Sequence, residues 1–589
     1  MAKVIEIDVL VVGAGPAGAA TSVFLGRHGV RTLMISRGRG TAETPRAHIT
    51  NQRTMEALRD AGLEDACMTL ASPGSHIEHT FWLRSMAGEE LARTWSWGND
   101  PRRVGDYRDA SPCSMSDLPQ TKLEPILVNE AARLGSDVRF GWELQAFTQD
   151  AEGVTAEVVD RLSEERVTVR ARYMVGADGA RSRVVEALGL PLTGMHGLGN
   201  VFNVLCDIDL SDHVRHRHGS LFAVIQPGSS YWAPVAVFRM VKPWTQWLVA
   251  LIVPQAAGKP EPTQKDFEDR IRDSVGDPSL PINILSTSIW TVNDVYAERY
   301  AEGRVLCLGD AVHRHPPTNG LGSNTCVQDA FNLAWKLALV IQGKAGEGLL
   351  ASYDAERQPI GKQIVARANK SFLQNHRLWD LLGAGTLVEA GPEEHAAVFG
   401  TKPGRASLRD AVDAFHHEYH AHGVEMNRRY VSEAVVADGS PEAKPARDPE
   451  LYYQASTRPG STLPHAWLCR RTPGPSVSTL DVAGKGRFCL LIGHGGEAWR
   501  AAAARLADRS GVDIEVVAIG RYLDWEDPYG RWETLREVEE EGCVLVRPDL
   551  IVGWRSRTLP NDPAAELARA LSIILDRPEV GAGDAVGSG

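Results

Sequence analysis

The apolar positions along the chain follow two patterns, and each predicts a different kind of sheet. Residues 7–12, 31–36, 172–177 and 304–308 form nearly continuous apolar runs, which are typical of parallel strands buried on both faces. Residues 233–240 instead alternate apolar and polar positions, which is typical of an antiparallel sheet. We therefore expect an α/β nucleotide-binding fold into which an antiparallel sheet is inserted.

Helical periodicity and polar breaks divide the rest of the chain. Residues 326–342 and most of 345–440 have helical spacing, and the polar, Pro-rich residues 438–448 are typical of a linker. Beyond the linker, apolar strands alternate with a helical segment, which predicts a small separate α/β domain. The expected boundaries are 1–200 and 296–375 for the two parts of the nucleotide-binding domain, 201–295 for the inserted sheet, 376–450 for the helical segment and linker, 451–580 for the C-terminal domain and 581–589 for a disordered tail.

Length, charge and cysteine spacing narrow the class of protein. A chain of 589 residues requires several domains, and a net charge of -12 argues against nucleic acid, which needs a concentrated basic face. The eight cysteines have no paired spacing and are expected to be reduced core thiols. Neither a signal-peptide pattern nor an apolar run of about 20 residues, the length of a membrane span, is present. We therefore expect a cytoplasmic protein that binds neither nucleic acid nor membrane.

A glycine-rich turn follows the first strand and opens a helix. Its residues are Gly13, Ala14, Gly15, Pro16, Ala17 and Gly18. In a βαβ unit, these glycines permit a tight turn, close approach of the backbone to a pyrophosphate and packing of helix on strand. A structural turn without a ligand is the alternative. Ser36 and Arg37 stand where a ribose-binding acid is expected, as weaker candidates for ribose and for adenine or phosphate, and this disfavours a nicotinamide dinucleotide here.

The pair Gly309-Asp310, at the end of a late apolar strand, narrows the identity of the dinucleotide. A strand-end carboxylate suits a sugar-alcohol chain, and the Pro/Gly-rich turn that follows opens a helix whose free N–H groups suit an electron-rich ring. This combination indicates FAD, with candidate contacts at Asp310, Pro317, Gly320, Leu321, Gly322, Ser323 and Asn324. The alternatives are an ordinary strand end with a helix cap, or a metal site at His313 and His315. No third ligand cluster supports a metal, so none is expected.

Three motifs, taken in order, resemble those of the class A flavoprotein aromatic hydroxylases. They are residues 13–18, residues 176–179 and Gly309-Asp310. Finer matches, which resemble the phenol hydroxylase branch and extend the resemblance over essentially the whole chain, lie at residues 45–56, 117–120, 309–315 and 422–427. The resemblance implies a p-hydroxybenzoate hydroxylase-like, Rossmann-like FAD-binding fold with an inserted substrate-binding sheet and a thioredoxin-like C-terminal domain. It also implies tightly bound, non-covalent FAD, with NAD(P)H as a transient co-substrate.

The reaction implied by this resemblance is hydroxylation of a phenol ortho to its hydroxyl, through a C4a-hydroperoxyflavin formed with O2, giving a catechol. Electrophilic attack is faster on a phenolate, and a phenol has a pKa of about 10, so a base near the substrate is required. His48 is the candidate base, Asp117 the residue that orients it, and Arg239 the charge partner of the phenolate or reduced flavin. The respective alternatives are a loop histidine, a helix cap before Pro119 and a structural ion pair.

Further cofactor contacts are implied outside the glycine-rich segments. Arg46 is a candidate for a cofactor phosphate, Gln120 for FAD, and Asp178 for a motif that serves both FAD and NAD(P)H. Surface polar filler is the alternative for Gln120. Val185 replaces the arginine that often ends the Asp178 motif. A second GxGxxG motif is absent from the sequence, so no separate nicotinamide domain is expected.

The C-terminal domain has no CxxC motif, so a redox role is not expected. Dimerisation or stabilisation is the better hypothesis, and we expect a homo-oligomer, either a dimer or a tetramer. Two rival functions stay open. One is a tailoring hydroxylase of a polycyclic or polyketide aromatic, and the other is a flavin-binding protein that serves assembly or interaction without catalysis.

Overall fold

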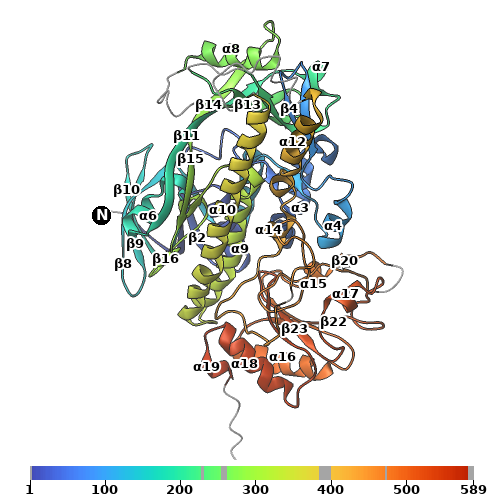
Figure 1. Cartoon of the computed structure of the whole chain (residues 1–589). Helices are drawn as coiled ribbons and strands as arrows, with labels where there is room; N and C mark the ends of the chain where they lie inside the picture. Colours follow the sequence, from blue (N-terminus) through green and yellow to red (C-terminus); the bar gives the residue numbers. More distant parts are fainter. Residues whose placement is uncertain are drawn as a thin grey trace, which may run out of the picture.

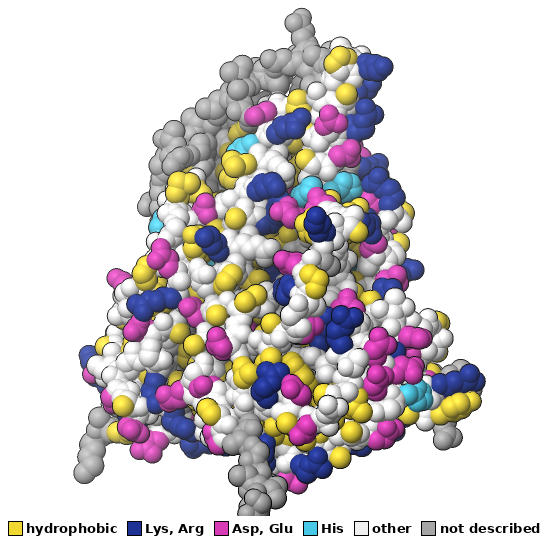
Figure 2. Space-filling model, turned by 60° about the horizontal axis from the view of Figure 1, so that its bottom comes forward, with side chains coloured by type: hydrophobic (Ala, Val, Ile, Leu, Met, Phe, Trp, Pro, Cys, Tyr) yellow, Lys and Arg dark blue, Asp and Glu magenta, His cyan; other side chains and the backbone are white. Residues whose placement is uncertain are grey.

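The computed structural model describes residues 3–226, 231–253, 262–383, 399–442, 444–470 and 474–581. Of the predicted disordered tail, Gly581 ends the last helix and residues 582–589 lie outside the described residues. No helix in the described ranges is long and apolar enough to span a membrane. On the face shown in Figure 2, basic and acidic side chains are mixed, so that face lacks the continuous basic surface that nucleic acid requires.

The first sheet is built on the apolar runs that predict buried strands. β1 pairs in parallel with β2 on one side and with β10 on the other, and β10 pairs in parallel with β17. The strands of this sheet are β1 (Lys3–Val12), β2 (Thr32–Ser36), β7 (Asp137–Phe140), β8 (Trp142–Gln149), β9 (Val154–Asp160), β10 (Arg166–Gly176), β16 (Ala301–Glu302) and β17 (Val305–Cys307). Four segments far apart in the sequence therefore end at one sheet edge, where an α/β fold binds its nucleotide.

Helices cover this sheet and carry the chain between its strands. Figure 1 shows the long helices α9 and α10 running side by side through the middle of the molecule. The helices are α1 (Pro16–Arg27), α2 (Gln52–Asp60), α3 (Glu64–Leu70), α4 (Val104–Ala110), α5 (Gln120–Arg133), α6 (Arg183–Leu188), α9 (Gly322–Ile341) and α10 (Ala351–Leu381). α10 crosses the expected boundary at residue 375 without a break, because its helical pattern continues to Leu381.

The second sheet is wider than the expected range 201–295. Its strands, in order, are β18 (His313–Arg314), β15 (Asn283–Ala297), β11 (Leu192–Asp207), β14 (Gln246–Val253), β13 (Val235–Lys242), β12 (Gly219–Ile225), β4 (His79–Leu83) and β5 (Glu90–Trp95). β4 joins in parallel with β12, and Phe81 stacks on Phe222 with ring centroids 5.2 Å apart. This aromatic core extends the sheet beyond the inserted segment and so moves the boundary. The short α7 (Ser211–Val214) and α8 (Gln264–Val275) complete this part.

The C-terminal part has a third sheet of its own, at the bottom of Figure 1. Its order is β22 (Ile514–Ala518), β21 (Phe488–Ile492), β23 (Cys543–Val546) and β24 (Val552–Ser556), and only β21 and β22 are parallel. The remaining elements are β19 (Trp467–Leu468), β20 (Val477–Ser478), α15 (Thr479–Val482), α16 (Glu497–Ser510), α17 (Arg531–Leu535), α18 (Pro563–Ile574) and α19 (Pro578–Gly581).

The predicted linker is held against the C-terminal part at one point. Asp438 is half-buried and accepts a hydrogen bond from Arg555 of β24 at 2.6 Å. The preceding segment contains α12 (Lys402–Asp413), α13 (His416–Tyr419) and α14 (His422–Met426). Residues 384–398 of the expected helical region lie outside the described residues.

Glu425 in α14 should make stability depend on pH. Burial raises the pKa of Glu425 to about 8, against the nearby positive charge of Arg428, which lowers it. Because the unfolded state releases its proton at lower pH, this group destabilises the fold progressively as pH rises from about 4.5 to about 8. We expect Glu425→Gln, which keeps a neutral side chain, to gain stability relative to the wild type between pH 5.5 and 8. The melting temperatures at the two pH values measure this gain.

Glu433→Gln provides the control for this variant, because Glu433 is exposed. Its melting temperature should follow that of the wild type at both pH values. A Glu425→Gln protein with the same offset from the wild type at pH 5.5 and pH 8 would contradict a protonated Glu425.

Candidate active site

The glycine-rich turn after β1 has the geometry of a phosphate cradle. Gly13 has a φ of +116°, and a Cβ there would lie 2.1 Å from the Ala177 carbonyl oxygen. A Cβ on Gly18 would lie 1.9 Å from the Gly13 carbonyl oxygen. Next to Gly15, in contrast, the nearest atom to an added Cβ is 3.9 Å away, and the first turn of α1 has no side-chain cap. Two glycines thus close the turn, and Gly15 leaves room for a diphosphate at the helix N-terminus.

The Gly309-Asp310 element lies directly against this turn. Gly309 has a φ of +66°, and a Cβ there would meet Ala17 and Cys326 at 2.9 Å. Its close packing on α1 leaves Asp310 exposed just beyond the end of β17. An exposed carboxylate at this edge can accept hydrogen bonds from sugar-alcohol hydroxyls.

The start of α9 forms the wall opposite the glycine-rich turn. Gly320 has a φ of +61°, and a Cβ there would meet Ile49 at 3.2 Å and Trp97 at 3.6 Å. Asn324 donates to the carbonyl oxygens of Ile49 and Gly320 and accepts from the amide of Asn51 at 2.9 Å. Leu321 and Asn324 are buried, Gly320, Gly322 and Ser323 are half-buried and Pro317 is exposed. The helix start and the strand that follows His48 are therefore one hydrogen-bonded unit.

The other predicted cofactor contacts differ in how free their side chains are. Arg37 and Arg46 are exposed, and Ser36 is half-buried at the end of β2. Gln120 donates to Glu124 at 2.6 Å. Asp178 accepts from the backbone amides of Arg183 at 2.8 Å and Val184 at 3.3 Å, so its carboxylate organises the start of α6.

The three predicted catalytic residues meet at one place. β3 (Ile49–Thr50) pairs with β6 (Ser116–Asp117), and this pairing sets His48 beside Asp117. The ring Nδ1 of His48 lies 3.3 Å from Asp117 Oδ1, and Arg239 of β13 donates to Asp117 Oδ2 at 2.6 Å. All three side chains are buried. Asp117 does not cap α5, because Pro119 is the residue before that helix and no side chain caps it.

Known proteins resemble this chain over almost its full length. Residues 6–368 match the family described as FAD binding domain, and residues 456–578 match the family described as aromatic-ring hydroxylase, C-terminal. The chain is 47% identical over 588 residues to a 2,4-dichlorophenol 6-monooxygenase of Delftia acidovorans, which covers 98% of this chain and 99% of that protein. It is also 42% identical to a phenol 2-monooxygenase of Pseudomonas sp. (strain EST1001), over 97% of this chain and 93% of that protein.

A solved structure agrees with these sequence matches. The flavin-dependent monooxygenase PieE, in complex with FAD and substrate, has a TM-score of 0.92 and 44% identity, covering 98% of this chain and all of that one. This chain belongs to the FAD-dependent aromatic hydroxylases. It is a class A flavoprotein monooxygenase of the phenol hydroxylase branch, with FAD as its cofactor and NAD(P)H as the co-substrate typical of the family.

In this aromatic hydroxylase the electrostatics of the triad keep the histidine neutral. Burial lowers the pKa of His48, Arg239 lowers it further, and Asp117 only partly opposes this. Burial raises the pKa of Asp117, but Arg239 and His48 together hold it below its ordinary value. At neutral pH the site therefore contains a neutral imidazole, a carboxylate and a guanidinium, and the imidazole is ready to accept a proton.

Several buried polar atoms of His48, Asp117, Arg239 and the nearby Trp97 lack a hydrogen-bond partner in the part of the chain that the structure describes. Among the described residues, no hydrogen bond reaches the two ring nitrogens of His48, Asp117 Oδ1, Arg239 Nε or Trp97 Nε1, although all are buried. Buried polar atoms are nearly always satisfied in folded proteins. A cluster of polar atoms without hydrogen-bond partners, beside the start of α9, therefore fits a site for water or for a ligand with a polar group.

Sequence reasoning missed Trp97, Glu124 and Asp329. Trp97 has a φ of +54° and lies between Gly320 and Arg239, whose guanidinium is 6.0 Å from the indole centroid. Glu124 faces the Gly15 turn, and Asp329 accepts from the Gly309 amide at 3.1 Å. The adjacent Gly98 was the only local signal for Trp97, because the other contacts arise from distant segments.

His313 and His315, near the start of α9, each contact another protein group. His313 Nε2 lies 2.9 Å from Asp329, and His315 Nδ1 lies 2.6 Å from the Pro316 carbonyl oxygen. The described residues hold one possible set of metal ligands, at Asp100, His416 and His420. Its carboxylate already accepts hydrogen bonds from the Arg102 guanidinium.

Asp310 offers a direct test of the cofactor pocket. Replacing Asp310 with Asn removes the charge of a hydrogen-bond acceptor, and such bonds contribute about 1.5–3 kcal/mol, so we expect FAD affinity to fall roughly tenfold or more. Flavin fluorescence during titration measures the dissociation constant. Asp508→Asn, an exposed acid in the C-terminal part, is the matched control and should leave it unchanged. Equal affinities for both variants would remove Asp310 from the pocket.

Proposed function

We propose that this enzyme hydroxylates a substituted phenol ortho to its hydroxyl group, using FAD, NAD(P)H and O2, and releases a catechol. The observation that carries the proposal is the buried group of His48, Asp117 and Arg239 beside the start of α9. A neutral base and a fixed positive charge are what deprotonation of a phenol requires. The similar phenol and dichlorophenol monooxygenases support the same substrate class.

His48 is the residue that takes the phenol proton. Asp117 Oδ1 lies 3.3 Å from its Nδ1, and the negative charge there favours the tautomer with the proton on that nitrogen, which leaves the lone pair of Nε2 for the substrate. The phenol hydroxyl would donate to Nε2, and the imidazolium formed would be stabilised by the Asp117 carboxylate. Asp117 is thus a positioning residue for the base, as Arg239 is for Asp117.

Arg239 provides the positive charge that balances the Asp117 carboxylate in this buried site. It lies on β13 among apolar neighbours and is bonded to Asp117 at 2.6 Å, so the predicted alternative of an ion pair holds for its ground state. The same guanidinium is a positive group beside the proposed base, where it would stabilise a phenolate. Its Nε has no partner among the described residues, which leaves one donor for the substrate oxygen.

The chain's own residues fit bound FAD. Gly15 and the start of α1 would hold the diphosphate, Asp310 the sugar-alcohol chain, and residues 320–324 the ring. When bound, FAD accepts a hydride from NAD(P)H and provides activated oxygen for the phenol. Ala223, Val235 and Val237 of the second sheet pack in one apolar cluster with Ile49 and Trp97, and such a cluster would limit water near the reacting ring.

The C-terminal part fits a thioredoxin-like domain. The parallel pair β21 and β22, with β23 and β24 added antiparallel in the order β22-β21-β23-β24, is the strand arrangement that supports this assignment. Its cysteines are buried, and Cys489 and Cys543 lie in the interior of the sheet, which supports a role in stability rather than redox chemistry. Homo-oligomer formation through this domain, and a cytoplasmic location, stay predictions.

Substrate-stimulated oxidation of NAD(P)H tests the proposed function. The purified enzyme with FAD should oxidise NADH or NADPH much faster when a small substituted phenol is added, and mass detection should find one added oxygen. A panel of small and polycyclic phenols decides between a phenol hydroxylase and a polyketide tailoring enzyme. If no phenol raises the rate, the hydroxylase assignment fails. Product from polycyclic phenols alone would favour the tailoring role.

His48→Ala tests the base. We expect kcat/KM to fall by roughly 100-fold or more near pH 6.5, because general base catalysis contributes about that much. The loss should shrink as pH approaches the pKa of the phenol, where free phenolate is abundant. His216→Ala, an exposed histidine of the second sheet region, should behave as the wild type. A loss of the same size at every pH would show that His48 positions the substrate instead.

A further inference from the structure

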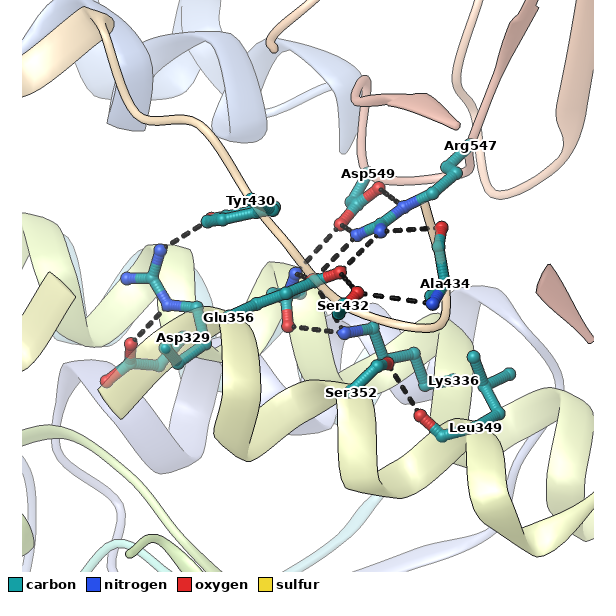
Figure 3. A network of polar contacts seen from close by, with 12 residues as sticks. Asp329, Lys336, Leu349, Ser352, Glu356, Tyr430, Ser432, Ala434, Arg547 and Asp549 are labelled. Atoms are coloured by element: carbon teal, nitrogen blue, oxygen red, sulfur yellow. Dashed lines mark hydrogen bonds and ion pairs between the residues drawn. The ribbon is translucent and has the colours of Figure 1, made fainter. Parts of the chain in front are cut away.

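A turn of the C-terminal part packs against helices of the main body with buried, charged side chains. Residues 547–551 connect β23 to β24, and within them residues 547–550 form a turn that Leu550 closes with a φ of +63°. Arg547 and Asp549 in this turn are buried, and each bonds to the other. In Figure 3 the two side chains converge on Glu356 and Lys336 of the long helices. Arg547 and Asp549 belong to the C-terminal part, whereas Glu356 and Lys336 belong to the main body, so this turn forms a contact between the two domains.

One set of contacts from the turn reaches α9 and α10. Arg547 donates to both carboxylate oxygens of Glu356, at 2.6 and 2.9 Å, and Asn332 donates to Asp549 at 3.0 Å and to Glu356 at 2.7 Å. Lys336 adds a second cation at 2.7 Å from Glu356. Every member of this group is buried. Buried ion groups of this kind tolerate only one arrangement, because each charge needs all of its partners.

A second set continues from α10 to the Gly309-Asp310 element. Arg357 follows Glu356 on α10 and donates to Asp329 at 2.7 Å and to the Tyr430 hydroxyl at 2.7 Å. Asp329 in turn accepts from the amide of Gly309 at 3.1 Å. The guanidinium of Arg547 lies 5.8 Å from the ring of Tyr430. A continuous chain of contacts thus joins the C-terminal turn to the peptide that precedes Asp310.

A third contact reaches the segment that carries His48. Arg53, in the first turn of α2, donates to the carbonyl oxygen of Asp549 at 3.0 Å. The cap of the same helix, Asn51, is bonded to Asn324 at the start of α9. The turn therefore contacts α2 directly. The contact is made by Arg53, three residues after the end of β3, the strand that follows His48.

We propose that residues 547–550 are a positioning element for the FAD pocket, which holds the Gly309-Asp310 element and the α2 segment in place across the domain boundary. The C-terminal domain thereby has a role in cofactor retention, without touching the cofactor. Arg547 and Asp549 of this domain are positioning residues, as is Tyr430 of the preceding segment, which contacts both Arg547 and Arg357. The proposal concerns FAD binding alone, so it stands or falls independently of the phenol assignment.

FAD retention by the holoenzyme tests this role. In Arg547→Lys one charge remains but the paired bonds to Glu356 are lost, and we expect the FAD dissociation constant to rise by about fivefold or more. Released flavin is measured by its fluorescence after dilution. Hydrogen exchange should be faster at residues 309–311 and unchanged in β21. Arg569→Lys, an exposed pair with Glu566 in the same domain, is the matched control.

Two milder variants keep the test decisive if Arg547→Lys does not fold. Tyr430→Phe removes only the hydroxyl that accepts from Arg357, and Arg53→Lys removes the contact with Asp549. Each should raise the FAD dissociation constant by about twofold or more while the melting temperature stays within about 2 °C of the wild type. A folded Arg547→Lys protein with wild-type affinity, or wild-type affinity in both milder variants, would overturn the proposal.

Discussion

The burial of Asp117 and Arg239 against the apolar face of the second sheet is the constraint on which the active site depends. Removing water from an unpaired charge costs several kcal/mol, so each of these charges requires the other. Their 2.6 Å contact therefore ties β6 to β13. Because β6 also pairs with β3, the same contact fixes the backbone that follows His48. One ion pair thus joins the nucleotide-binding part to the second sheet and places His48 between them.

The parts of this site that follow from local sterics could be predicted from the sequence. Gly13, Gly18 and Gly309 have no room for a Cβ, and that requirement is visible as glycine at fixed places after apolar strands. Asp117 could not be assigned in the same way, because a carboxylate two residues before Pro119 also suits a helix cap. Its real partner, Arg239, is distant in sequence and reaches it only through sheet packing. Trp97 and Asp329 depend on such packing as well.

The fold shows the same division between local and distant information. Continuous and alternating apolar runs predict the parallel and antiparallel sheets, since both patterns arise within single strands. They do not say which strand lies next to which. β4 and β5 join the second sheet through pairing of β4 with β12, where Phe81 stacks on Phe222. No pattern within residues 79–95 specifies that neighbour. Domain boundaries drawn along the chain therefore misplace elements that cross between sheets.

The buried charged residues at the domain boundary are better suited to fixing the position of the C-terminal turn on α10 than to increasing the stability of that contact. An apolar contact between α10 and the C-terminal turn would give comparable stability, because pairing buried charges only offsets their loss of water. It would also allow the two surfaces to slide. Arg547 bonded to both oxygens of Glu356 allows one position, and the next residue along the helix, Arg357, passes that position to Asp329 and the Gly309 amide. A pocket that must hold a long dinucleotide at several points needs this kind of fixed geometry.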